Sequence, residues 1–495
     1  MNRTIAALQR HASSAPLKVA LQDEAGTLTY EEMRVAIEQL AQQLNEHRPG
    51  VLAMLADNSR DWVLADLAAH TAGIPCVPLP LFFSADQIVH VLGTAGVDQV
   101  LTDQPERLLA ALQQPGLAVE PFCGALRRVR LRRAADPVAS LPPGTRKVTF
   151  TSGTTGEPKG VCLSADMMET VAESLWIASD ADRDDRHLCL LPLATLLENI
   201  GGVYAPLLAG ATICVPRLAA VGLSGSSGLD AGRLLAALSE WRASTAIMVP
   251  QMLQAVVTAG RANIPLPRGL RYLAVGGAPV ASRLLEQAQA LGLPVYQGYG
   301  LSECASVVAV SRAGESRSGS VGKPLPHIRI EFADDGEILV RGLAWHGYLG
   351  ESDLRPQPDC IATGDIGYLD AEGFLFLTGR KKNMFITSFG RNVAPEWVEG
   401  ELAAHPGIAQ AAIFGESRPF NCAVIVAHPG TPYGAIEAAL DLANRRLPDY
   451  AQVRGWIPAI EPFTPNNGMS TPNGRLRRTA ILGRYAAQIE ALYQP

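Results

Sequence analysis

Several features that mark other classes of protein are missing from this sequence. Lys and Arg (42) do not outnumber Asp and Glu (48), and the formal net charge is −6. Because binding to a phosphate backbone relies on clustered positive charge, we expect no nucleic-acid partner. No uninterrupted apolar run approaches the roughly 18 residues of a membrane-spanning helix, so we expect no transmembrane segment. The N-terminal stretch MNRTIAALQRHASS lacks the apolar core of a signal peptide.

The cysteines lack the spacing of a disulfide framework or a zinc site. All 8 are scattered along the 495 residues, and no C-x-x-C pair occurs among them. Scattered cysteines in a chain of this size are typical of buried, reduced thiols. We therefore expect a cytoplasmic protein whose cysteines are neither paired nor bound to zinc.

The composition is that of a globular protein, and strand-like and helix-like segments alternate as in an α/β fold. The chain is 47% hydrophobic and 18% charged, and its 495 residues exceed what one ordinary core holds. Short apolar runs alternate with longer helical patterns such as SRDWVLADLAAHTAG. These runs are VLAMLA, CVPLPL, HLCLLPL, GATICVP, TAIMVP, LRYLAVGG and LPVYQGYG. They indicate parallel strands that are covered by helices on both faces.

Towards the C-terminus the pattern changes twice. Around 321–380, RIEFA, GEILVRG and GFLFLTGR are separated by Gly and Asp-Gly turns and indicate a small antiparallel region. Beyond it, the helices PEWVEGELAAH and GAIEAALDLANRRL enclose the strands AQAAIFG and CAVIVAH. We predict a large N-terminal domain over 1–381 and a small α+β C-terminal domain over 382–495. The segment LSGSSG at 223–228 is expected to be a loop.

A loop rich in glycine and hydroxyl groups follows the predicted strand RKVTF. It reads TSGTTGEPKG over 151–160, with Pro158 where the P-loop pattern requires its second Gly. Glycines let backbone N–H groups face an anion closely, hydroxyls donate further hydrogen bonds, and Lys159 adds positive charge. The sequence therefore predicts an anion-binding loop that is not a P-loop.

In its wider context this loop resembles the phosphate loop of the adenylate-forming superfamily. Four further segments match motifs of that family in the family's order: YLAVGGAPV, YQGYGLSE, TGDIGYLDAEGFLFLTGRKKNMF and NGMSTPNGRLRR. They are similar to its adenine-binding segments, its ribose-binding and hinge region, and its C-terminal catalytic loop. The resemblance extends over most of the chain and is closest to fatty-acyl and long-chain acyl-CoA synthetases.

The resemblance implies an activity in two steps and a fold to match. A carboxylic acid attacks the α-phosphorus of ATP, pyrophosphate leaves, and a thiol then takes the acyl group from the acyl-adenylate. The first step gathers negative charge, so it relies on positioning and on cations rather than on a protein nucleophile. The implied small molecules are ATP, Mg²⁺ and coenzyme A, and the C-terminal domain is expected to be mobile between the two steps.

The phosphate and metal sites follow by carrying the motifs over residue by residue. The phosphate loop is expected to hold the β- and γ-phosphates through Thr151, Ser152, Gly153, Thr154, Thr155 and Gly156, with Lys159 assisting. Mg²⁺ prefers oxygen ligands, and the resemblance assigns it to Glu303, with Thr151 as a weaker candidate.

The nucleoside site follows in the same way. The adenine is expected to lie against Gly276, Gly277, Ala278, Gln297, Gly298, Tyr299 and Gly300. Ser302 is expected to reach the α-phosphate, and Asp365 and Arg380 are expected to hydrogen-bond the ribose hydroxyls. Lys382 corresponds to the family's hinge residue.

Three positions depart from the family pattern. Arg475 stands where the C-terminal loop normally carries its catalytic lysine, and arginine keeps the charge without the compact ammonium. Thr195 replaces the histidine that usually follows LPLA in the segment gating the acid pocket. Phe389 replaces a glycine beside the channel for the thiol arm. We expect Arg475, with Lys159 and Glu303, to be catalytic.

The resulting hypothesis is an AMP-forming acid–thiol ligase for a fatty or other apolar acid, because the pocket segments IMVPQMLQAV and AVGGAPV are largely apolar. The thiol is expected to be coenzyme A. Phe389 motivates the alternative of an acyl-carrier-protein phosphopantetheine, and Arg475 motivates a nucleotide-binding protein without turnover. A homodimer stays possible on the sequence alone.

Overall fold

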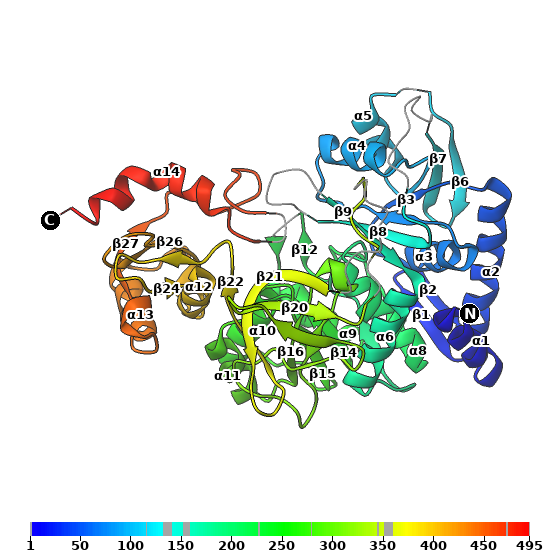
Figure 1. The fold of residues 1–495 in the computed structure, drawn as a ribbon. Helices are drawn as coiled ribbons and strands as arrows, with labels where there is room; N and C mark the ends of the chain where they lie inside the picture. The colour runs from blue at the N-terminus through cyan, green and yellow to red at the C-terminus, as the bar shows by residue number, and fades with distance from the viewer. Residues whose placement is uncertain are drawn as a thin grey trace.

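Two large mixed sheets build most of the molecule, and a small sheet at the C-terminal end is set apart from them (Figure 1). The computed structural model describes residues 2–114, 116–131, 141–151, 159–225, 228–278, 280–343, 346–350, 360–471 and 474–494, with the side chains of Thr151 and Asn392 left aside.

The larger sheet has nine strands and a parallel centre. Their order is β18 (Lys323–Pro324), β17 (Ala309–Val310), β16 (Val295–Tyr299), β15 (Tyr272–Val275), β14 (Thr245–Met248), β10 (Arg186–Leu188), β11 (Thr212–Cys214), β1 (Val19–Asp23) and β2 (Gly26–Thr29). All neighbours from β16 to β1 pair in parallel, whereas both edges are antiparallel. The apolar runs therefore form the parallel strands that the sequence predicts.

The second sheet has seven strands. Their order is β6 (Val119–Cys123), β7 (Leu126–Arg130), β5 (Gln99–Thr102), β3 (Leu52–Leu55), β4 (Cys76–Pro78), β8 (Thr145–Thr151) and β9 (Lys159–Ser164). The strands β8 and β9 pair antiparallel and end on either side of 152–158. The glycine-rich loop thus joins the last two strands of this sheet, although its own residues lie outside the described ones.

Helices cover both faces of the two sheets. The core between the sheets is filled by α1 (Arg3–Ser14), α2 (Tyr30–His47), α3 (Arg60–Ala72), α6 (Ala165–Ser179), α7 (Leu196–Glu198), the π-helix η1 (Asn199–Tyr204) and α8 (Ala205–Ala209). The outer face of the nine-stranded sheet packs against α9 (Ala231–Glu240), α10 (Pro250–Arg261) and α11 (Ser282–Ala290). The outer face of the seven-stranded sheet packs against α4 (Ala85–Thr94) and α5 (Pro105–Leu112). No described helix combines the length and the apolar character that crossing a membrane requires.

The antiparallel region is a four-stranded sheet of β19 (Arg329–Phe332), β20 (Glu337–Arg341), β21 (Cys360–Leu369) and β22 (Leu375–Arg380). The sequence predicts three of these strands. The longest, β21, was not recognised, because its glycines interrupt the apolar pattern and its pairing shifts at Ile366/Gly367. The segment expected to be a loop at 223–228 includes the ends of a short hairpin, β12 (Leu223–Ser224) and β13 (Gly228–Leu229).

The C-terminal part has its own sheet and its own cores. The sheet contains β25 (Ile408–Phe414), β26 (Asn421–Ala427) and β27 (Val453–Pro458), preceded by the short pair β23 (Phe385–Ile386) and β24 (Asn392–Val393). One face packs on α12 (Pro395–Ala403) and α13 (Tyr433–Asn444), and the other on α14 (Arg478–Ala491). Short 3-10 turns are η2 (Ser302–Cys304) and η3 (Asp449–Ala451). Contacts to the large part include the pair of Arg446 with Glu286.

Candidate active site

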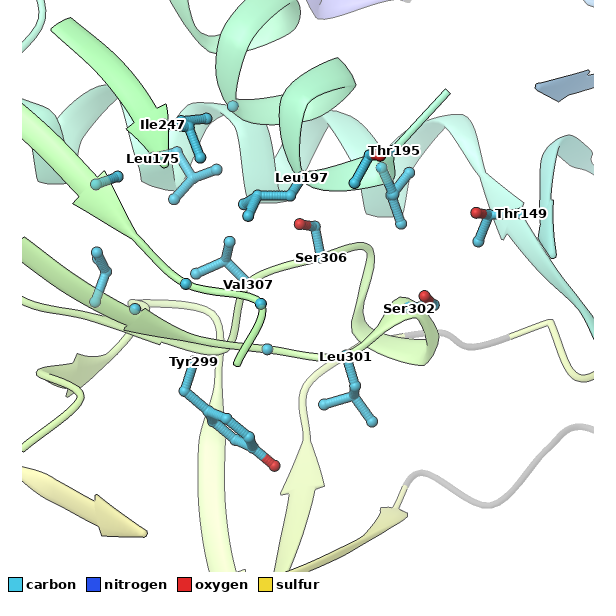
Figure 2. Close-up of a pocket in the computed structure, with 18 of the residues that line it drawn as sticks. Thr149, Leu175, Thr195, Leu197, Ile247, Tyr299, Leu301, Ser302, Ser306 and Val307 are labelled. Carbon is cyan, nitrogen blue, oxygen red and sulfur yellow. The ribbon is translucent and has the colours of Figure 1, made fainter. Parts of the chain in front are cut away.

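A cavity of about 760 Å³ opens at the carboxyl ends of the central parallel strands. Ligands of open α/β sheets commonly bind at this edge. Figure 2 shows the side chains that line part of it: Thr149, Leu175, Thr195, Leu197, Ile247, Tyr299, Leu301, Ser302, Ser306 and Val307. The cavity therefore brings together residues from both large sheets, from the helices between them and, through Arg475, from the C-terminal part.

Close backbone packing explains the glycines at one end of the cavity. A Cβ on Gly300 would lie 1.7 Å from the carbonyl oxygen of Ser306, and Gly277 has φ of +83°. Neither position tolerates a side chain, so the backbone itself forms the wall here. Gly276 and Gly298 line the same wall. A flat ring can lie against such a surface, which suits an adenine base.

Beside this wall, three polar side chains form one hydrogen-bonded set. The Tyr299 hydroxyl donates to Asp365 at 2.7 Å, and Arg380 Nε donates to the other carboxylate oxygen at 2.6 Å. Burial, and then the neighbouring carboxylate, raise the pKa of Tyr299, which keeps it a hydrogen-bond donor. Tyr299 and Arg380 line the cavity, whereas Asp365 lies behind them. The set is a preorganised acceptor and donor for a diol such as ribose.

A carboxylate and a cation lie near the start of β9, where the described chain resumes after the glycine-rich loop. Glu303 accepts a hydrogen bond from the Tyr348 hydroxyl at 2.6 Å, and Lys159 Nζ lies 5.4 Å from the centroid of the same tyrosine ring. All of these side chains line the cavity. A single carboxylate beside a nucleotide site fits Mg²⁺, which takes most of its remaining ligands from phosphate oxygens and water.

The C-terminal loop adds positive charge at the mouth. Arg475, Arg380 and Lys382 all line the cavity. The pKa of Arg475 is lowered by partial removal from solvent and by Arg380, and that of Lys382 by burial and by both arginines. Among the described residues no carboxylate pairs with Arg475. Its guanidinium is therefore available to an anionic ligand.

Not every residue of the sequence-based site can be placed in the cavity. Ser152, Gly153, Thr154, Thr155, Gly156 and the side chain of Thr151 lie outside the described residues. Ala278 is exposed and Gln297 half-buried, and neither belongs to the cavity wall. Lys159, Gly276, Gly277, Gly298, Tyr299, Gly300, Ser302, Glu303, Arg380, Lys382 and Arg475 do.

A second, more apolar part of the cavity runs along the face of the nine-stranded sheet. Ile247 of β14 and Leu175 of α6 approach Gly201 of η1 so closely that a Cβ there would lie 2.8 Å from Ile247 Cδ1. Leu197 and Thr195 continue this wall towards the nucleotide end (Figure 2). This part fits the tail of an organic acid, and it includes the position at which the sequence departs from the histidine of the family pattern.

The structure adds one buried polar cluster that was not recognised from the sequence. His187 Nε2 lies 3.1 Å from Glu198 Oε1, and its Nδ1 lies 2.9 Å from Thr245 Oγ1. His187 and Thr245 line the cavity, and Glu198 is fully buried behind them. The sequence carried one signal for this cluster, which was a glutamate within the apolar stretch LLPLATLLEN. Because such a carboxylate is costly to bury alone, it required a partner.

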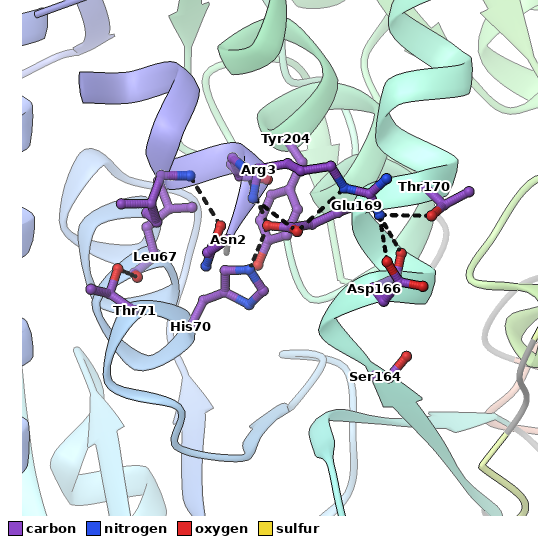
Figure 3. A network of polar contacts seen from close by, with 12 residues as sticks. Asn2, Arg3, Leu67, His70, Thr71, Ser164, Asp166, Glu169, Thr170 and Tyr204 are labelled. Atoms are coloured by element: carbon purple, nitrogen blue, oxygen red, sulfur yellow. Dashed lines mark hydrogen bonds and ion pairs between the residues drawn. The ribbon is translucent and has the colours of Figure 1, made fainter. Parts of the chain in front are cut away.

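A further buried network supports the helices around the cavity. Glu169 of α6 accepts from the backbone N–H groups of Arg3 and Thr4 at 3.0 and 3.2 Å and contacts His70 Nε2 at 3.2 Å (Figure 3). Burial alone would raise the pKa of Glu169, but His70 and these N–H groups lower it to about 2. The carboxylate is thus held ionised, and it ties α1 and α3 to α6.

Comparisons with known proteins cover nearly the whole chain. The family described as "AMP-binding enzyme" matches residues 8–349, and "AMP-binding enzyme C-terminal domain" matches 382–495. A long-chain-fatty-acid–CoA ligase of Mycobacterium bovis is 28% identical, over 88% of this chain and 86% of its own. A feruloyl-CoA synthase of an Amycolatopsis species is 30% identical, over 83% and 85%.

Solved structures agree with the fold described above. An o-succinylbenzoate coenzyme A synthetase of Bacillus subtilis in complex with AMP superimposes with a TM-score of 0.74 at 25% identity, covering 96% of this chain and 97% of that one. An anthranilate CoA ligase in complex with anthranoyl-AMP gives a TM-score of 0.82 at 20% identity, with 99% and 98% covered.

Proposed function

The chain belongs to the AMP-binding enzyme family, and from this premise we propose that it is an acid–CoA ligase. It activates a carboxylic acid with ATP to an acyl-adenylate, releases pyrophosphate, and transfers the acyl group to the thiol of coenzyme A. The observation that carries this proposal is one continuous cavity. It joins a glycine wall, a diol-binding set and several cations to an apolar pocket.

In the first step a substrate carboxylate oxygen bonds to the α-phosphorus while the bond to the pyrophosphate oxygen breaks. Lys159 and Arg475 balance the negative charge that gathers on the phosphates, and the set of Tyr299, Asp365 and Arg380 holds the ribose. Cations that are already in place stabilise this developing charge without the cost of reorganisation during the reaction. Mg²⁺ at Glu303 would neutralise further phosphate charge.

In the second step the acyl carbon accepts the thiol and AMP leaves. The same cavity must then admit a thiol instead of pyrophosphate, so the C-terminal part has to move. We place the boundary between residues 381 and 382 and the hinge at Lys382. The separate cores of the C-terminal part and the start of the second family match at 382 support this division.

The acid is a fatty or other apolar one. Leu175, Leu197 and Ile247 supply the apolar wall, and the named relatives act on long-chain fatty acids and on ferulate. The acceptor is coenzyme A, in keeping with those relatives. A carrier-protein arm is the alternative, because Phe389 is 75% exposed and its ring is available to a partner surface.

The experiment is a pyrophosphate-release screen with purified protein, ATP and Mg²⁺ across fatty, aryl and amino acids. We expect release with apolar acids, and formation of the acyl-CoA when coenzyme A is added. If product forms only with a phosphopantetheinylated carrier protein, that carrier, and not coenzyme A, is the acceptor. The absence of any acid-dependent ATP–pyrophosphate exchange would instead leave a nucleotide-binding protein without turnover.

A further inference from the structure

The acid pocket extends far beyond the nucleotide end, along the strands of the nine-stranded sheet. Along β15 its wall runs from Tyr272, where the strand begins, to Gly276, the residue that follows the strand. Four residues of strand span about 13 Å, at roughly 3.3 Å per residue. Thr245 pairs with both Tyr272 and His187 in register, so these three residues lie side by side towards the end of the pocket away from Gly276.

This far end is polar although the corridor leading to it is apolar. His187 and Thr245 are 4% and 6% exposed and contact each other through Nδ1 and Oγ1 at 2.9 Å. Asp185 reaches the same end but is already bound to Arg271 and Ser244. These groups are already hydrogen-bonded to protein partners, so a tail that forms one more hydrogen bond here gains free energy that a purely apolar tail does not.

The partners of His187 determine which hydrogen bond the far end can still make. Glu198 accepts from the backbone N–H of Leu191 at 2.9 Å, and an ionised carboxylate can only accept. His187 Nε2 must then carry the proton that faces Glu198, and on a neutral ring Nδ1 accepts from the Thr245 hydroxyl. We assign this tautomer from the partners. The oxygen of Thr245 keeps its lone pairs for a donor in the pocket.

The apolar wall of the corridor is closed beside Gly201. Gly201 leaves so little space that an added Cβ would lie 2.8 Å from Ile247 Cδ1 and 3.7 Å from Leu175 Cδ1. Gly201 therefore packs directly against Ile247 and lies close to Leu175, and these three residues form one closed wall along which the tail lies.

We propose that Thr245, oriented by His187 and Glu198, selects acids whose tail carries a hydroxyl or amino group that reaches it. This proposal rests on the acid–CoA ligase function proposed above and specifies its substrate. Thr245 accepts the hydrogen bond of the tail, and Glu198 acts as a positioning residue through His187.

The test compares matched acids that differ only at the tail. One pair is para-hydroxycinnamate and para-methylcinnamate, and a second is an ω-hydroxy fatty acid and the methyl-ended acid of equal length. We expect kcat/KM for pyrophosphate release to favour the hydroxyl member by about tenfold or more in a pair that is turned over, the size of one buried hydrogen bond. Equal values, or a preference for the methyl member, would overturn the substrate assignment alone. No release with any acid would instead contradict the ligase function.

Variants of Thr245 separate selectivity from folding. Thr245→Val should abolish the preference by raising KM for the hydroxyl acid, and Thr245→Ser should restore it. Thr212 is the matched control, because it is equally buried in the same sheet, on β11, but donates to the carbonyl of Val19 instead of lining the cavity. A preference that survives Thr245→Val, or that is lost equally in Thr212→Val, would refute the role of Thr245.

Metal analysis provides an independent check on the same cluster. The ligand atoms of His187, Cys189 and Glu198 lie within 4.8 Å of one another, a spacing that a metal ion could also use. Zinc would occupy the histidine nitrogen that faces Glu198 and would remove the hydrogen bond on which the tautomer depends. We expect the purified protein to contain less than a tenth of an equivalent of zinc. A full equivalent, lost in Glu198→Gln, would overturn the proposal.

Discussion

Replacing Arg475 tests the feature in which this chain departs most from its family pattern. Arg475 lies on the loop before α14, where its backbone N–H donates to Thr471 Oγ1 at 3.1 Å and its carbonyl accepts from the Thr471 N–H at 2.7 Å. These bonds fix the turn while the guanidinium reaches the cavity wall. Arg475→Ala removes the charge and leaves the turn in place.

The expected loss follows from the other cations at the site. Arg380 is held in place by its ion pair with Asp365, and Lys159 is the first residue of β9. Arg475 is therefore the cation of the C-terminal part that can meet the charge developing between the acid and the α-phosphate. Loss of one such preorganised donor costs about 3 kcal/mol, or roughly 10²-fold to 10³-fold in rate.

The assay separates the two half-reactions. Adenylation is followed by acid-dependent ATP–pyrophosphate exchange, and thiolysis by the conversion of supplied acyl-adenylate with coenzyme A. We expect Arg475→Ala to lose the first by roughly 10²-fold to 10³-fold and to retain the second within about threefold. Arg475→Lys keeps a positive charge and should retain at least a tenth of the exchange rate. Arg477→Ala is the control, since Arg477 is exposed on the same loop and outside the cavity wall.

Two results would refute this reasoning. Exchange that persists in Arg475→Ala would show that another group meets the α-phosphate. An equal loss in both half-reactions would show that Arg475 supports the fold of the loop rather than adenylation.

The remaining predictions concern binding and stability. Asp365→Ala removes the acceptor of Tyr299 and Arg380, and should weaken ATP binding about tenfold to a hundredfold in calorimetric titration; unchanged affinity would reject the ribose assignment. Lys147→Met leaves Asp66 buried without its cation, 2.8 Å away in the native protein, and should cost about 3–5 kcal/mol in urea unfolding. Adding Asp66→Leu should recover most of that loss, and a lack of recovery would argue against the ion pair. The pKa of His405 is lowered to about 4 by burial and by nearby arginines. The unfolded chain therefore binds a proton at a higher pH than the folded chain, so stability should fall between about pH 6.5 and pH 4, and His405→Gln should flatten that fall.

Much of the fold could be predicted because the central strands are apolar on both faces. TAIMVP and LRYLAVGG needed no knowledge of their neighbours to be recognised as β14 and β15. The strand β21 could not be recognised in this way, since Gly364 and Gly367 interrupt its apolar pattern and its pairing with β22 shifts register at Ile366/Gly367. The helix α14 was missed although Ile481, Tyr485 and Ile489 follow helical spacing, so there the signal existed.

Only the residues of the site that belong to recognised sequence motifs could be predicted. The resemblance named Tyr299 and Asp365, but their hydrogen bond joins β16 to β21 across 66 residues and is visible only in the structure. The pair of His187 and Glu198 has no motif at all. Its residues are ordinary in sequence and acquire a role because β10 and the helical segment after it enclose one end of the pocket.

A buried lysine links the strand that leads into the glycine-rich loop to the wall of the apolar pocket. Lys147 lies on β8, four residues before the described strand ends at the glycine-rich loop. Its ammonium contacts Asp66 of α3 and Asn199, the first residue of the π-helix that carries Gly201. A displacement of β8 would separate this buried ion pair, which is energetically costly, so the strand and the wall of the acid pocket are held together. The groups outside this unit are those of β21, β22 and the C-terminal loop: Asp365, Arg380 and Arg475. Substitutions in the pocket wall, such as Thr195, and in the C-terminal loop, such as Arg475, therefore lie in separately held parts of the structure.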